Sequence, residues 1–245
     1  MSKIVAIGGG EIREKSTRQI DREIIKFSGK KQPRLLFIPT ASSDAEGYFL
    51  GVKKYFGSLG CRVDVLYLIK EKLTKKEIEE KILKSDIIYV GGGNTLKMMN
   101  IWRKFGVDKI LKKALQKNIV LSGISAGSIC WFKYGNSDSR KFSSNSSKLI
   151  KVSGLDFINA LHCPHYDVEV HRQKDLKRMM KKSPLVAIAL ENNCAIQIKD
   201  NEYRIINSKK TAKAYKIYWK RNKYVKEEIE KTNKFLPINS LLEKI

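Results

Sequence analysis

A five-residue motif, GISAG at residues 123–127, has the spacing of a serine placed for nucleophilic chemistry. It follows the apolar run at 119–122 and precedes a short helix-like run at 128–132, so Ser125 is expected on a tight turn between strand and helix. The flanking glycines avoid a collision of Cβ atoms with the neighbouring backbone. Helix N–H groups beside the hydroxyl could stabilise a developing oxyanion. The pattern predicts a serine nucleophile, and a serine that only caps the helix is the alternative.

A triple glycine at residues 91–93 also follows a strand-like run, and it opens a helix that Asn94 or Thr95 would cap. Its spacing meets neither the dinucleotide-binding pattern nor the P-loop pattern, so nucleotide binding is weakly supported. A glycine amide can face Ser125 without obstruction by a side chain. We therefore expect this loop to supply a second donor to the oxyanion.

The sequence offers three histidines as the base that a serine nucleophile needs: His162, His165 and His171. His165 follows Pro164 in a loop directly after the strand-like run at 157–161, from which an imidazole can point to the end of the sheet. His162 ends that run and is expected to be structural. His171 begins a basic helix, where capping or exposure explains it. His165 is the preferred base.

Several carboxylates could hold the imidazole in the required tautomer. Glu191 is the preferred acid because it stands at the carboxyl end of the strand expected at 185–190. Asp138, in the serine-rich loop at 136–148, and Asp167, two residues beyond His165, stay open as alternatives. Cys163 is a weaker candidate nucleophile, since no strand-turn-helix pattern surrounds it.

The elements that must position these residues alternate between buried strands and amphipathic helices. Strands are expected at 4–7, 35–38, 63–68, 86–90 and 119–124, with helices at 18–27, 47–59, 75–84, 95–105 and 107–117. Further strands are expected at 185–190 and 194–199, and a C-terminal β-hairpin from 211–219 and 224–228. This order predicts a single α/β domain, 1–245, with a mostly parallel sheet covered by helices on both faces.

Four loops with unusual chemistry follow the expected strands: residues 8–11, 39–43, 91–95 and 123–127. The carboxyl ends of parallel strands meet at one edge of a sheet, where ligands bind in open α/β folds. These loops should therefore outline one site.

Composition narrows the class of protein. The formal net charge is +24 and the isoelectric point is about 9.8, which favours nucleic acid or anionic surfaces as partners. The excess is mostly lysine spread along helices, and no helix-turn-helix, zinc-finger or aromatic-stacking pattern accompanies it, so specific nucleic-acid recognition is disfavoured. No signal peptide or apolar run of membrane-spanning length is present, so a cytoplasmic protein is expected. The four cysteines lack metal-ligand spacing.

Three motifs in order, residues 90–95 (VGGGNT), 123–127 (GISAG) and 164–166 (PHY), together resemble the peptidase E family of serine peptidases. These are α-aspartyl dipeptidases related to cyanophycinase. The likeness extends to residues 6–10, 38–41 and 190–192, and so covers roughly residues 1 to 230. It implies a fold like that of the class I glutamine amidotransferases, which is flavodoxin-like, with serine in place of their cysteine.

The resemblance also implies roles for residues at matching positions. It supports Ser125 as nucleophile and His165 as base, and it leaves Asp138 and Glu191 both open as the acid. The oxyanion hole would use the amides of Gly92 or Gly93 and of Ala126. An arginine on the helix after the base would recognise a substrate aspartate, and the residues expected to contact substrate are Arg172, Asn94 and Thr40.

The predicted function is hydrolysis of a small peptide through an acyl-Ser125 intermediate, with N-terminal aspartate as the expected preference. No metal or organic cofactor is required for this chemistry. Two other classes stay open: a noncatalytic amidotransferase-like binding module, and an esterase or other amide hydrolase. A homodimer is compatible with the sequence.

Overall fold

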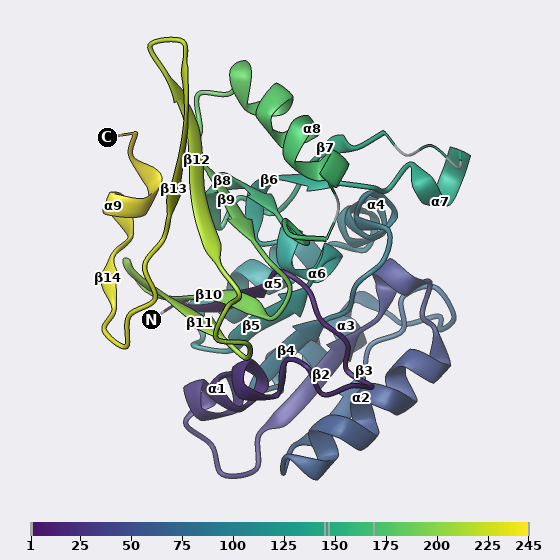
Figure 1. The fold of residues 1–245 in the computed structure, drawn as a ribbon. Helices are drawn as coiled ribbons and strands as arrows, with labels where there is room; N and C mark the ends of the chain where they lie inside the picture. Colours follow the sequence, from purple (N-terminus) through teal and green to yellow (C-terminus); the bar gives the residue numbers. More distant parts are fainter. Residues whose placement is uncertain (1, 145, 147, 169, 245) are drawn as a thin grey trace.

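A sheet that the described residues build from eight strands forms the centre of the fold in the computed structural model, which describes residues 2–144, 146, 148–168 and 170–244 (Figure 1). Its strand order is β14-β11-β10-β1-β5-β4-β2-β3. The bounds are β1 (Lys3–Ile7), β2 (Arg34–Ile38), β3 (Arg62–Val65), β4 (Ile87–Val90), β5 (Val120–Ile124), β10 (Cys194–Lys199), β11 (Glu202–Asn207) and β14 (Leu236–Pro237). Strands β1, β5, β4, β2 and β3 are parallel to one another, whereas β10, β11 and β14 each pair antiparallel.

A second sheet, to which the described residues contribute six strands, has the order β13-β12-β9-β8-β6-β7. Its strands are β6 (Phe132–Ser137), β7 (Ile150–Ser153), β8 (Ile158–Cys163), β9 (Ala187–Leu190), β12 (Ala214–Lys220) and β13 (Lys223–Glu228). Strands β6, β8 and β9 are parallel to one another, and β7, β12 and β13 pair antiparallel. The long pair β12 and β13 rises beside α8 in Figure 1, and the Trp219 indole N–H donates to the Lys177 carbonyl of that helix at 3.2 Å.

Helices cover both faces of the first sheet. The described helices are α1 (Arg18–Ser28), α2 (Glu46–Ser58), α3 (Lys75–Leu83), α4 (Thr95–Phe105), α5 (Val107–Gln116), α6 (Ala126–Ile129), α7 (Lys141–Ser144), α8 (Val170–Lys181), α9 (Ile238–Leu242) and the 3₁₀ turn η1 (Thr40–Ser42). Of these, α8 packs on the second sheet. Because successive strand residues point to opposite faces, Val5 and Ile7 pack with α1 and α2, while Ile4 and Ala6 pack with the cluster that includes α3, α4 and α5.

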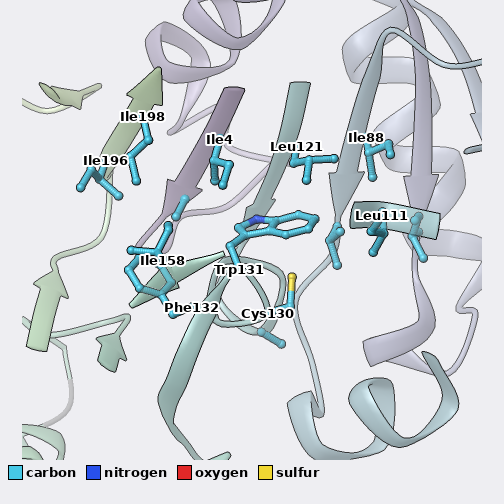
Figure 2. Packing of buried hydrophobic residues seen from close by; sticks show 14 of the residues in the cluster. Ile4, Ile88, Leu111, Leu121, Cys130, Trp131, Phe132, Ile158, Ile196 and Ile198 are labelled. Carbon is cyan, nitrogen blue, oxygen red and sulfur yellow. The ribbon is translucent and has the colours of Figure 1, made fainter. Parts of the chain in front are cut away.

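The core continues from the first sheet into the second through the segment after α6. Trp131, fully buried, lies among Ile4, Leu121 and Ile158 (Figure 2). Its ring stacks on Phe157 with centroids 6.3 Å apart. Burying an aromatic side chain of this size contributes on the order of 3 kcal/mol, so this contact fixes the chain just beyond Ser125.

The structure differs from the expected fold in two respects. The prediction of one mostly parallel sheet is wrong, because β10, β11 and the second sheet introduce antiparallel pairs. The helix expected at 128–132 is α6, which begins and ends earlier. The first two residues of the expected serine-rich loop, 136 and 137, belong to strand β6. Residues 145 and 147 of that loop lie outside the described residues. The strands expected at 211–219 and 224–228 correspond to the antiparallel pair β12 and β13, beyond which the chain continues into β14 and α9.

Across the described residues, none of the helices combines the length and the apolar character needed to cross a membrane.

Candidate active site

Ser125 lies between β5 and α6 in a backbone conformation that few side chains adopt, with φ 56° and ψ −114°. Its N–H donates to the Ile7 carbonyl at 3.1 Å, which ties the turn to β1. A Cβ on Gly123 would lie 2.3 Å from the Gly127 carbonyl oxygen, and one on Gly127 would lie 2.1 Å from the Val90 carbonyl oxygen. Close backbone packing around the serine therefore requires glycine at both flanking positions, Gly123 and Gly127.

His165 lies beside this serine. Its Nε2 is 2.9 Å from Ser125 Oγ, and its Nδ1 is 2.7 Å from Asn192 Oδ1. Because an amide oxygen only accepts, Nδ1 carries the proton, and Nε2 accepts the hydrogen bond from the serine hydroxyl. The His165 N–H donates to the Gly8 carbonyl at 3.0 Å, which fixes the base to the end of β1. Serine, imidazole and amide thus form one hydrogen-bonded chain.

Asn192 is the third member of this hydrogen-bonded chain, and the sequence did not single it out. Its backbone N–H donates to Asp167 Oδ1 at 2.9 Å. A Cβ on Gly9 would lie 1.9 Å from Asn192 Oδ1 and 2.4 Å from His165 Nδ1, so a glycine is needed for the pair to meet. A signal did exist, since asparagine orients the histidine in some cysteine proteases, and Asn192 lies in residues 190–192, one of the segments that resemble the peptidase E family.

The prediction that Glu191 orients the imidazole is wrong. Its carboxylate accepts from the Lys213 N–H at 2.9 Å and from the Tyr215 hydroxyl at 3.1 Å, on the side of β12. Glu191 and Asn192 lie in the turn between β9 and β10, and their side chains diverge there: Asn192 contacts His165, and Glu191 contacts Lys213 and Tyr215. The alternative acid, Asp138, pairs instead with Arg172 at 3.9 Å.

The expected substrate contacts also lie elsewhere. Arg172 is on α8, as predicted, but its side chain is 2% exposed, and its Nη1 donates to the Asn136 carbonyl at 3.0 Å. The buried hydroxyl of Thr40 accepts from the Trp102 indole N–H at 3.3 Å. Asn94 caps α4 by accepting from the Lys97 N–H at 3.0 Å. These three side chains have structural partners, and none of them lines the cavity beside Ser125.

That cavity has a volume of about 440 Å³, a size typical of sites for small ligands. It lies between the β1–α1 loop, helix α2 and the pair formed by Ser125 and His165. Its lining residues are Gly10, Glu11, Ile12, Arg13, Gly47, Tyr48, Gly51, Val52, Gly92, Ile124, Ser125 and His165. A larger cavity of about 570 Å³ lies at the start of β2 and β3, and no histidine lines it. We place the candidate site at the smaller cavity because Ser125 and His165 both line it.

Two of the expected oxyanion donors flank Ser125. A Cβ on Gly92 would lie 3.4 Å from Ser125 Cβ, and the Gly92 N–H donates to the Tyr48 hydroxyl at 3.4 Å. Ala126 is the first residue of α6, where backbone N–H groups have no acceptor within the helix. Gly93 is turned toward η1, since a Cβ there would lie 2.3 Å from the Ala41 carbonyl oxygen.

Comparison with known proteins identifies the family of this chain. The sequence profile of peptidase family S51 matches residues 4–206. The chain therefore belongs to this family, and it is a serine peptidase hydrolase. The uncharacterized peptidase YgaJ of Bacillus subtilis (strain 168) is 34% identical over 220 residues, which cover 89% of this chain and 92% of that protein.

Solved structures share the fold. A peptidase from an acI-B1 Actinobacterium superposes with a TM-score of 0.71 at 16% identity, over 97% of each chain. A Listeria monocytogenes EGD-e protein, provisionally assigned as a peptidase E, superposes with a TM-score of 0.64 at 23% identity. The match covers 84% of this chain and 98% of that one.

Proposed function

We propose that this chain hydrolyses the peptide bond of small peptides through an acyl-Ser125 intermediate. The observation that carries the proposal is the hydrogen-bonded chain Ser125 Oγ, His165 and Asn192, with distances of 2.9 and 2.7 Å, at the wall of a cavity. Ser125 Oγ attacks the carbonyl carbon while His165 Nε2 takes the hydroxyl proton and returns it to the leaving amine. Water then attacks the ester, His165 accepts its proton, and the acid product leaves with Ser125 restored.

Trapping the intermediate tests this proposal. Hydroxylamine added to the reaction should intercept the acyl-enzyme and give a hydroxamate of the acyl residue. Because every substrate with the same acyl group passes through the same ester, the ratio of hydroxamate to acid should not depend on the leaving amine. A ratio that changes with the leaving amine, or the absence of hydroxamate, would show that water attacks the peptide directly.

We further propose that Glu11 and Arg13, rather than Arg172, recognise the peptide. Both line the cavity, and among the described residues neither side chain has a hydrogen-bond or ion-pair partner. The backbone of Glu11 is nevertheless fixed, since its N–H donates to Ser16 Oγ at 2.8 Å. A carboxylate near an oxyanion site is unfavourable unless the substrate supplies a cation, so Glu11 suits the α-ammonium group and Arg13 suits a substrate carboxylate.

The Arg13→Ala variant tests the aspartate preference. Loss of a charge-assisted pair should lower kcat/KM for Asp-Xaa peptides by at least about tenfold, while Ala-Xaa peptides are nearly unaffected. Lys15→Ala is the matched control, because Lys15 is an exposed cation on the same loop that does not line the cavity. Equal effects of both variants on Asp-Xaa hydrolysis would remove Arg13 from this role.

Arg172→Ala should chiefly lower the melting temperature, because Arg172 is buried.

The roles of Asn192 and Glu191 can be separated by a pair of substitutions. Asn192→Ala should lower kcat by roughly a hundredfold, because the imidazole loses the group that fixes its tautomer. Glu191→Gln should change kcat by less than about threefold, since its carboxylate contacts β12. The measurement is kcat on one dipeptide for both variants. A larger loss in Glu191→Gln than in Asn192→Ala would restore Glu191 as the orienting acid.

A further inference from the structure

A buried polar chain lies directly behind the serine. Ser128 Oγ is 2.7 Å from the Ser125 carbonyl oxygen and 2.8 Å from His162 Nε2. On the other side of the ring, His162 Nδ1 is 2.9 Å from the Ile188 carbonyl oxygen of β9. Ser128 and His162 are both fully buried. The chain therefore connects the carbonyl of Ser125 to the second sheet through two side chains that lie outside the cavity.

The proton positions in this chain follow from its acceptors. The Ile188 carbonyl can only accept, so His162 Nδ1 carries a proton. Burial lowers the pKa of His162 to about 3, and the nearby His165 and Arg172 act in the same direction. His162 is therefore neutral and its Nε2 is an acceptor. The single hydroxyl proton of Ser128 is thus shared between two acceptors, Nε2 and the Ser125 carbonyl.

The ring of His162 is held in one orientation. Phe132 stacks on it with centroids 4.5 Å apart and planes inclined by 14°. Helix α6 spans only four residues, Ala126–Ile129, and a helix of one turn has little stability of its own. Its first turn must be fixed by contacts such as those of Ser128. The Ser125 carbonyl also accepts from the backbone N–H groups of Ser128 and Ile129, at 2.9 and 3.0 Å.

We propose that Ser128 and His162 are positioning residues for the oxyanion hole, because they fix the peptide unit that joins Ser125 to Ala126. The carbonyl of Ser125 and the N–H of Ala126 belong to one planar unit, so holding the carbonyl sets the direction of the N–H. Hydrogen bonds to that carbonyl also polarise the N–H and strengthen it as a donor. The inference rests on the proposed function, in which the Ala126 N–H binds the oxyanion.

The Ser128→Ala variant tests the inference. Loss of a positioned donor predicts that kcat falls by roughly ten- to hundredfold with little change in KM. Binding of a peptide aldehyde, whose hemiacetal oxygen occupies the oxyanion hole, should weaken by a similar factor. Ser128→Thr, which keeps the hydroxyl, should recover most of the rate. His162→Gln in the Ser128→Ala background should add little, because His162 acts through Ser128.

Ser122→Ala is the matched control, because Ser122 is also buried and its hydroxyl donates to the Ile88 carbonyl at 2.8 Å. It should lose stability much as Ser128→Ala does, yet keep wild-type kcat and aldehyde affinity. The inference is overturned if Ser128→Ala matches Ser122→Ala in both kcat and aldehyde affinity, or if Ser128→Ala changes KM alone.

Labelling by a small uncharged fluorophosphonate distinguishes a failure of the proposed function from a failure of this inference. An unlabelled wild type contradicts the proposed function, whereas equal labelling rates of wild type and Ser128→Ala contradict only this inference.

Discussion

The single variants Ser125→Ala and His165→Ala should each lower kcat by about 10⁴-fold or more, and the double variant should be no worse than either one. The reason is that the two side chains perform one step: Oγ cannot attack without the base, and the base has no role without Oγ. Their separation of 2.9 Å is the distance at which the proton passes directly. The measurement is kcat for all three variants on one dipeptide.

Losses that multiply in the double variant would contradict this interpretation, because they would show that the two residues act independently. The variants must be as well folded as the wild type, and their melting temperatures provide that control. Ser125 has φ 56°, which is strained for serine and for alanine alike. Ser125→Ala is therefore expected to be about as stable as the wild type, so a lost rate reports chemistry.

The Gly9→Ala variant should lower kcat/KM by about a hundredfold or more, although Gly9 takes no part in the chemistry. Its added methyl would lie 1.9 Å from Asn192 Oδ1 and 2.4 Å from His165 Nδ1. Contacts this short force the imidazole or the amide to move. A displacement of about 1 Å in a catalytic group can cost a hundredfold in rate.

Gly57→Ala provides the comparison, because an added Cβ there meets nothing within 4 Å. Gly57 lies in the last turn of α2, where alanine should raise the free energy of unfolding by at most about 0.5 to 1 kcal/mol. Kinetic assays and thermal melts of both variants should therefore separate the two glycines. Wild-type activity in Gly9→Ala would mean that the imidazole tolerates another position and that the observed geometry is not required.

Local patterns in the sequence were sufficient for the parallel strands of the first sheet and their helices. The expected strand at 35–38 and helix at 95–105 agree closely with β2 and α4, because buried apolar runs, a capping residue and a terminal glycine are all local signals. The pairing of β1 with β10 joins residues almost the whole chain apart, such as Lys3 and Lys199. No local pattern encodes such a contact, which is why the mixed sheets were missed.

In the candidate site, too, local sequence patterns predict some residues, and distant contacts determine the others. Ser125 could be predicted from its motif, and His165 from the scarcity of histidines. The third member could not, because Glu191 and Asn192 are neighbours at the end of β9 and either side chain could have faced the base. That choice depends on which of them β12 engages, through Lys213 and Tyr215. Likewise, Arg172 belongs to a lysine-rich run, and only tertiary packing shows that its side chain is buried.

If Ser125 becomes covalently bonded during catalysis, a fluorophosphonate should modify it, and mass spectrometry of the labelled protein measures this directly. Trypsin should release residues 118–133 as one peptide, since Lys117 and Lys133 bound it. That peptide contains Ser122, Ser125 and Ser128, so fragment ions must assign the adduct. We expect one adduct on Ser125 and no labelling of the Ser125→Ala protein. An adduct on another residue, or equal labelling of both proteins, would contradict this expectation.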